Sequence, residues 1–95
     1  MKNPCVYLLA NRPHGTLYVG VTSDLVKRVW QHKNDVFEGF SSKYRIHTLV
    51  WFEQHASMEA AIAREKQIKA GSRQRKIQLI ETSNAQWLDL YEGLL

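Results

Sequence analysis

Five polar side chains carry the residue types that phosphodiester hydrolysis needs: Tyr7, Tyr18, Arg28, His32 and Glu65. A carboxylate can hold a divalent cation while leaving waters and phosphate oxygens in its other coordination positions. A guanidinium can balance the negative charge that develops on phosphorus. A tyrosine, with a pKa of about 10, becomes a useful base only where nearby cations favour its phenolate. The set predicts a site that pairs a metal-binding carboxylate with a cation and a proton acceptor.

The two tyrosines lie on a predicted β-hairpin. Residues 5–10 are β-prone and continuously apolar, as expected of a central strand buried on both faces. Residues 11–15 contain proline and glycine in turn positions, and residues 16–21 form a second β-prone run. Gly20 would weaken this strand, and such a glycine often lets another backbone or a ligand approach closely.

Arg28 and His32 lie on the predicted helix that follows the hairpin. Residues 22–24, Thr-Ser-Asp, can cap its free N–H groups. Arg28 and His32 are four positions apart, so they share one face of the helix. The apolar residues expected to face the sheet are Leu25, Val29 and Val36, with Val26 and Phe37 widening the stripe.

Glu65 lies on a second predicted helix, over residues 57–70, which Gly71 ends. The helical spacing places Glu65 on the inward stripe, where a carboxylate is unfavourable unless it is paired or binds a metal. Arg64 and Lys66 lie on other faces and are poor candidates to neutralise it. The other members of the stripe are Met58, Ala61, Ile62 and Ile68.

The remaining elements follow from the same rules. Residues 38–42 are predicted to form a loop, and residues 45–53 a third strand that is rich in β-branched and aromatic side chains. Ser72 is predicted to cap a third helix, and Asn84 a last helical stretch. The residues expected to pack inward here are Ile77, Ile80, Trp87, Leu88 and Tyr91.

Composition places limits on the kind of protein. Ninety-five residues suffice for one domain, over residues 1–95, with a single core. No apolar run approaches the roughly 20 residues of a membrane span, and no signal-peptide pattern is present, so a cytoplasmic location is expected. The single cysteine, Cys5, excludes an internal disulfide and a cysteine-based zinc cluster.

Charge points to a polyanionic partner. The net charge is +4, and residues 64–76 carry six Lys or Arg against Glu65 alone. A solvated helix face usually mixes both signs, so a phosphate-facing role is favoured over a plain solvated surface. Trp30 is expected in the core with Trp51 and Trp87, or else exposed and stacked on a base. The predicted nucleic-acid contacts are Lys27, Lys33, Arg64, Lys69, Arg73, Arg75 and Lys76, which would bind the backbone without reading sequence.

In this order along the chain, these residues resemble the signature of the GIY-YIG endonuclease superfamily. Residues 5–7, Cys-Val-Tyr, and 18–20, Tyr-Val-Gly, resemble its two tripeptides. Arg28 falls where the family keeps its catalytic arginine, and His32 matches a position held by His or Tyr. Residues 64–69 resemble the helix that bears the metal-binding glutamate. The likeness covers most of the chain and is closest to small stand-alone bacterial members, UPF0213-like.

The resemblance implies an α/β (α+β) fold, with a three-stranded antiparallel sheet flanked by helices. It implies hydrolysis of DNA that depends on Mg²⁺ or Mn²⁺, with DNA repair or recombination as the expected setting. Glu65 would hold the metal, Tyr7 or Tyr18 would deprotonate water, Arg28 would stabilise the transition state, and His32 would assist. Whether the DNA is single-stranded, duplex or branched stays open.

The sequence departs from the family pattern at three places. Cys5 replaces the first glycine, and Val21 stands where excision-repair members keep a lysine. Asn84 corresponds to the family's late asparagine, at a longer spacing from Glu65 than expected. No separate DNA-binding domain is expected, which leaves target choice to the core or to a protein partner. The alternatives are a non-catalytic nucleic-acid-binding module and a partner-dependent nuclease subunit.

Overall fold

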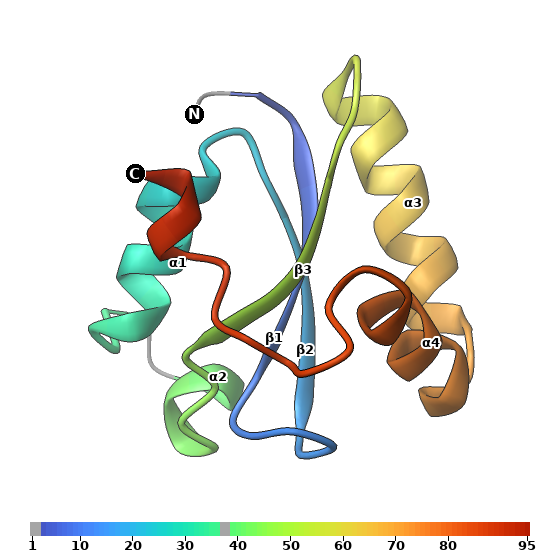
Figure 1. The fold of residues 1–95 in the computed structure, drawn as a ribbon. Coiled ribbons are helices and arrows are strands. Elements are labelled where there is room, and N and C mark those ends of the chain that lie inside the picture. Colours follow the sequence, from blue (N-terminus) through green and yellow to red (C-terminus); the bar gives the residue numbers. More distant parts are fainter. Residues whose placement is uncertain (1–2, 37–38) are drawn as a thin grey trace.

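A three-stranded antiparallel sheet divides the molecule into two layers of helices. A computed structural model describes residues 3–36 and 39–95. The strand order is β2-β1-β3, so the first strand lies in the centre. Figure 1 shows α1 and the C-terminal segment on one face of the sheet, and α3 and α4 on the other. The elements are β1 (Cys5–Ala10), β2 (Leu17–Thr22), α1 (Leu25–Lys33), α2 (Phe40–Lys43), β3 (Thr48–Gln54), α3 (Met58–Ala70), α4 (Arg73–Ser83) and a 3₁₀ turn, η1 (Glu92–Leu94).

The central strand β1 is buried on both faces, as its continuous apolar sequence predicts. Successive side chains point to opposite faces of a strand, so β1 contributes to two separate cores. Val6, Leu8 and Ala10 pack with α3 and α4. Cys5, Tyr7 and Leu9 pack on the opposite side, with α1. This alternation places Tyr7 on the α1 side of the sheet.

Helix α1 begins where the sequence predicts. The Asp24 side chain caps it by accepting the Lys27 N–H, and Leu25 and Val29 are buried. The predicted stripe is wrong at Val36, which is 52% exposed because the helix already ends at Lys33. Val26 is partly buried, and Phe37 lies outside the described residues.

Two sequence predictions fail between α1 and α3. Helix α2 forms within the predicted loop 38–42, of which Glu38 lies outside the described residues. Strand β3 begins three residues later than predicted, since Arg45 has a left-handed backbone with φ 54° that a strand cannot contain. Trp30, on α1, is 51% exposed, so the core placement is wrong and the exposed alternative is the one found, whereas Trp51 and Trp87 are buried as predicted.

Helices α3 and α4 cover the other face of the sheet. Ser57 and Ser72 cap them as predicted, accepting the N–H groups of Ala60 and Arg75. The buried residues of α4, Ile77 and Ile80, are also as predicted. In α3, only Ala61 and Ile68 of the predicted stripe are buried. Met58 and Ile62 are more than one-third exposed, because α3 faces the sheet along the line through Ala61 and Ile68.

The C-terminal segment is a strap of irregular backbone and not the predicted helix. Asn84 ends α4 instead of starting a new helix, and Leu88 is 60% exposed. The Asn84 amide donates to the carbonyls of Val50 and Leu88, and its oxygen accepts the Leu88 N–H. Buried Trp87 adopts φ 58°, which turns the chain back toward the sheet.

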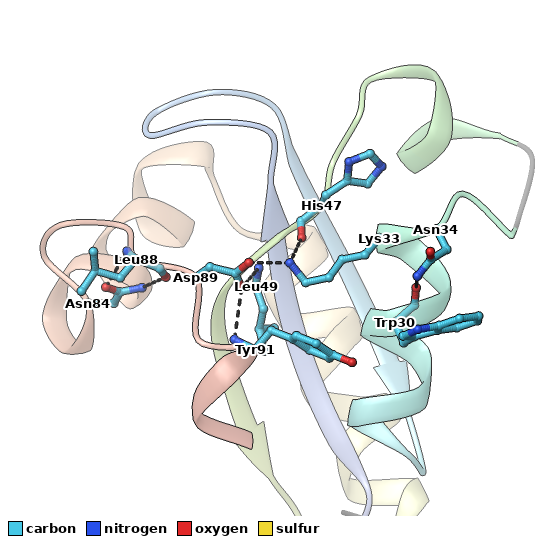
Figure 2. A network of polar contacts seen from close by, with 9 residues as sticks. All are labelled: Trp30, Lys33, Asn34, His47, Leu49, Asn84, Leu88, Asp89 and Tyr91. Atoms are coloured by element: carbon cyan, nitrogen blue, oxygen red, sulfur yellow. Dashed lines mark hydrogen bonds and ion pairs between the residues drawn. The ribbon is translucent and has the colours of Figure 1, made fainter. Parts of the chain in front are cut away.

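Asp89 fastens this strap to strand β3 and helix α1 (Figure 2). Its carboxylate accepts the backbone N–H groups of Leu49 and Tyr91 at 3.2 and 3.1 Å. Lys33 contacts the same carboxylate and donates to the His47 carbonyl at 2.9 Å. Segments from three parts of the chain therefore meet at one ion pair.

Within the described residues, no helix is long and apolar enough to cross a lipid bilayer.

Candidate active site

Tyr7 and Gly20 form the centre of the candidate site. They are directly opposite each other on β1 and β2, and Tyr7 has no exposed surface. A Cβ atom at Gly20 would lie 2.4 Å from both Cζ and Oη of Tyr7. The sequence suggested a ligand or another backbone beside Gly20, and this is corrected: the ring of Tyr7 itself fills that space. Gly20 is needed so that this ring can cross the neighbouring strand.

Helix α1 brings His32 to the buried tyrosine. The Tyr7 hydroxyl and His32 Nε2 are 3.0 Å apart, a hydrogen bond inside the protein. Tyr18, which is partly exposed on the edge strand β2, lies beside both rings. Its ring centroid is 5.1 Å from that of His32 and 6.3 Å from that of Tyr7. Three residues from three elements therefore converge, in agreement with the sequence-based grouping.

Burial keeps both groups of this hydrogen bond neutral. Burial, reinforced by Tyr18, raises the pKa of Tyr7, and the charge and hydrogen bond of Arg28 counteract the shift. Burial, followed by Arg28 and His47, lowers the pKa of His32 to about 4. At pH 7, Tyr7 is therefore a phenol and His32 a neutral imidazole. The cation that the site presents is Arg28.

Glu65 reaches this site from the opposite layer. It lies on α3, which packs against β2 and β1, and its side chain is 15% exposed. Among the charges that shift the pKa of Tyr7, that of Glu65 has the smallest effect, and it raises the pKa. The candidate site therefore lies at the β2 edge of the sheet, between α1 and α3.

The ion-pair partner of Glu65 is Lys69, one helical turn away at 3.3 Å. Sequence analysis rejected Arg64 and Lys66 as partners but assigned Lys69 to phosphate binding. Arg64 pairs instead with Glu53 at 3.1 Å. An i, i+4 spacing is a signal that could have revealed the Glu65–Lys69 pair. Lys69 is 55% exposed, so solvent screens the pair and Lys69 can move away.

The donor set fits a hard divalent cation better than zinc. Among residues 3–36 and 39–95, no group of three or more His, Cys, Asp or Glu side chains is placed to hold a metal ion. Structural and catalytic zinc sites need three or four such ligands. Mg²⁺ commonly takes one or two carboxylates and keeps waters and substrate phosphates as its other ligands. Glu65 alone is a sufficient protein ligand for that second kind of site.

Several of the predicted phosphate contacts make hydrogen bonds or ion pairs within the fold. Arg73 donates to the carbonyls of His14 and Gly15 at 2.6 and 2.7 Å, which ties α4 to the hairpin turn. Lys76 donates to the Gly71 carbonyl at 2.8 Å. Lys33 holds the C-terminal strap. The other predicted contacts are Arg64, which binds Glu53, Lys69, which binds Glu65, and the exposed Lys27 and Arg75.

A separate pocket of about 460 Å³ lies between α3, α4 and β3. Arg64, Arg75 and Lys76 line it together with the apolar side chains of Trp51 and Ile68. It lies on the α3 and α4 side of the sheet, away from Tyr7 and His32. An enzyme that cuts a polymer backbone needs an open surface more than a deep pocket, so the aromatic cluster at β2 stays the better candidate.

Two aromatic residues that the sequence analysis missed continue the cluster outward. Phe40 and Tyr44 come from α2 and its C-terminal cap, in a segment that was predicted as a loop. The rings of Tyr18 and Phe40 are 6.4 Å apart, and those of Phe40 and Tyr44 are 4.8 Å apart. The signal in the sequence is a Phe and a Tyr four positions apart, a helical spacing.

Comparison with known proteins identifies the family to which this chain belongs. Residues 3–78 match the model of the GIY-YIG catalytic domain, so this chain belongs to the GIY-YIG family, a family of nucleases. The match includes Tyr7, Tyr18, Arg28, His32 and Glu65 and stops before Asn84 and the C-terminal strap.

Individual proteins of the UPF0213 group are similar to this chain. The chain is 36% identical over 66 residues to a UPF0213 protein of Staphylococcus saprophyticus, covering 70% of this chain and 80% of that protein. It is 33% identical over 67 residues to one of Staphylococcus epidermidis, covering 70% and 82%. A solution NMR structure of a UPF0213 protein from Bacillus halodurans is similar with a TM-score of 0.56, at 25% identity, over 95% of both chains. These similarities confirm the predicted family and the α+β fold.

Proposed function

We propose that this protein is an endonuclease that hydrolyses DNA phosphodiester bonds and uses Mg²⁺ or Mn²⁺ held by Glu65. One observation carries the proposal: Tyr7, Tyr18 and His32 converge beside the edge strand β2, and the charge and hydrogen bond of Arg28 lower the pKa of Tyr7. Glu65 lies on α3, which packs against the same strand. Membership of the GIY-YIG family supports the same chemistry.

The exposure of the two tyrosines separates their roles. Tyr7 has no exposed surface and a raised pKa, so it neither meets the attacking water nor loses its proton readily. Tyr18 is partly exposed beside it. We therefore assign contact with the attacking water to Tyr18. Tyr7 acts as a positioning residue that holds His32, and through it α1, against the sheet.

Charged and polar groups beside the tyrosines supply the remaining parts of the proposed mechanism. Arg28, whose charge and hydrogen bond lower the pKa of Tyr7, stabilises the negative charge that develops on phosphorus. His32, with a pKa of about 4, stays neutral at pH 7 and therefore contributes hydrogen bonding rather than charge. A divalent ion at Glu65 would supply Lewis acidity toward the phosphate oxygens.

The test is cleavage of labelled single-stranded, duplex and branched DNA with Mg²⁺, Mn²⁺ or EDTA. Glu65→Ala should abolish cleavage and keep the fold, because an ion pair with an exposed lysine contributes about 0–1 kcal/mol. Glu59→Ala, an exposed carboxylate in the first turn of α3, is the matched control and should cut like the wild type.

Other outcomes identify the alternatives. Cleavage by Glu65→Ala at the wild-type rate would disprove the assigned metal ligand. DNA binding without cutting in every metal would favour a binding module, and cutting that begins only after a cell extract is added would favour a partner-dependent subunit.

A further inference from the structure

Four aromatic rings form a continuous row from the buried centre of the candidate site to the surface. This aromatic row consists of Tyr7, Tyr18, Phe40 and Tyr44, with successive centroids 6.3, 6.4 and 4.8 Å apart. Tyr7, at the inner end, has no exposed surface, whereas the two outer residues are exposed, Phe40 at 50% and Tyr44 at 42%. The Tyr18 and Phe40 rings are stacked, with an interplanar angle of 29°. The row therefore continues the site outward to two exposed aromatic side chains.

The fold holds the outer rings in place. The Tyr44 N–H donates to the Phe40 carbonyl at 3.1 Å, which fixes the two residues one helical turn apart. The Asn11 amide donates to the Tyr44 carbonyl at 3.4 Å and connects α2 to the hairpin that carries Tyr18. Both contacts use backbone atoms of the outer residues. Their rings can therefore be removed without breaking the contacts that position α2.

Cations accompany the exposed rings. Lys43 Nζ lies 5.5 Å from the centre of the Tyr44 ring, and Arg45 follows directly; both residues are exposed. Exposed rings next to cations match the two parts of a nucleotide strand, since bases stack on rings and phosphates bind cations.

We propose that the outer part of the aromatic row, Phe40 and Tyr44, binds unpaired bases of a DNA strand. It would thereby direct the site toward single-stranded DNA or single-stranded flaps. This inference rests on the proposed nuclease function and adds its substrate class. Every base offers a π-face, so the binding tolerates sequence. Bases within a duplex are already stacked on each other, and freeing them costs a few kcal/mol, which disfavours duplex at this surface.

The experiment measures binding in EDTA, where cleavage does not interfere. Fluorescence anisotropy would compare a short labelled single strand with a blunt duplex of the same sequence. The variants are Phe40→Ala, Tyr44→Ala and their combination. Leu88→Ala is the control, because Leu88 is a large apolar side chain that is 60% exposed but lies on the C-terminal strap, outside the row.

Each alanine variant should weaken single-strand binding about tenfold, since stacking contributes roughly 1–3 kcal/mol per base. The double variant should lose more, the duplex affinity should be unchanged, and the Leu88→Ala protein should bind both DNAs like the wild type. A fluorescent adenine analogue in the strand should be quenched by the wild type and not by the double variant. Phe40→Leu, which keeps apolar area but removes the ring, should lose affinity like Phe40→Ala.

The results separate this inference from the proposed function. Undiminished single-strand binding by the double variant, with a melting temperature like that of the wild type, would overturn the stacking surface. So would a loss of affinity that is equal for single strand and duplex. Glu65-dependent cleavage of DNA in either case would leave the nuclease standing. Conversely, ring-dependent binding of single strands without cleavage would support base stacking on the aromatic row and refute the proposed nuclease activity.

Discussion

Gly20→Ala should be among the most damaging small substitutions in this protein. The added Cβ would lie 2.4 Å from Cζ and Oη and 2.8 Å from Cε1 of Tyr7. These distances are far inside van der Waals contact, and Tyr7 has no exposed surface into which it could turn. Gly20 has no left-handed φ, so the clash with the ring accounts for the effect.

The magnitude follows from two contributions. Overpacking a filled core costs about 1–3 kcal/mol. Displacing the ring also breaks the 3.0 Å contact with His32 and leaves a buried hydroxyl unsatisfied, for about 1–3 kcal/mol more. Removing a strand glycine returns about 0.5–1 kcal/mol of chain entropy. The net loss is roughly 1–5 kcal/mol, and a middle value of about 3 kcal/mol lowers the melting temperature by about 12–24 °C in a domain of this size.

Thermal unfolding followed by circular dichroism is the assay, with Gly93→Ala as the control. Nothing lies within 4 Å of a Cβ at Gly93, so that variant should melt like the wild type. In a Tyr7→Leu background, the shorter side chain removes the clash, and Gly20→Ala should cost much less. A Gly20→Ala protein that melts like the wild type would refute the placement of the Tyr7 ring.

Two further predictions concern His32 and Asn84. Burial, Arg28 and His47 lower the pKa of His32 from 6.5 to about 4, so the fold favours its neutral form, and the stability that this provides above pH 6.5 is lost as pH falls toward 4. The melting temperature should therefore fall less between pH 7 and pH 5 in His32→Gln than in the wild type, and equal slopes would contradict the buried neutral imidazole. Asn84→Ala removes three hydrogen bonds that hold the C-terminal strap and should cost about 1–3 kcal/mol, measured by urea unfolding against the exposed Ser83→Ala. Matching midpoints for these two variants would show that the strap does not need its amide.

The sequence alone determined the features that depend on local chemistry. A continuous apolar run predicted β1 as the central strand, and hydroxyl or carboxylate residues predicted the caps at Asp24, Ser57 and Ser72. The order and spacing of Tyr7, Tyr18, Arg28, His32 and Glu65 indicated the family, because a short hairpin and its following helix leave little freedom in where these side chains lie.

Only the tertiary structure decided which charged side chains form hydrogen bonds within the fold. Lys33, Arg73 and Lys76 were indistinguishable by sequence from phosphate-binding cations, yet each binds a backbone carbonyl, two of them in segments far along the chain. Helical spacing placed Glu65 and Met58 on the face of α3 that packs against the sheet. It could not determine how α3 is rotated about its axis, so it was wrong for Met58, which is exposed.

The aromatic row also depends on the tertiary structure. Tyr18, Phe40 and Tyr44 lie on a strand and on a short helix, and the hydrogen bond from Asn11 fastens that helix to the hairpin turn. Composition, charge and periodicity report on neighbours along the chain. Contacts between residues more than twenty positions apart depend on how the layers pack, and that packing decides which rings and charges face a ligand.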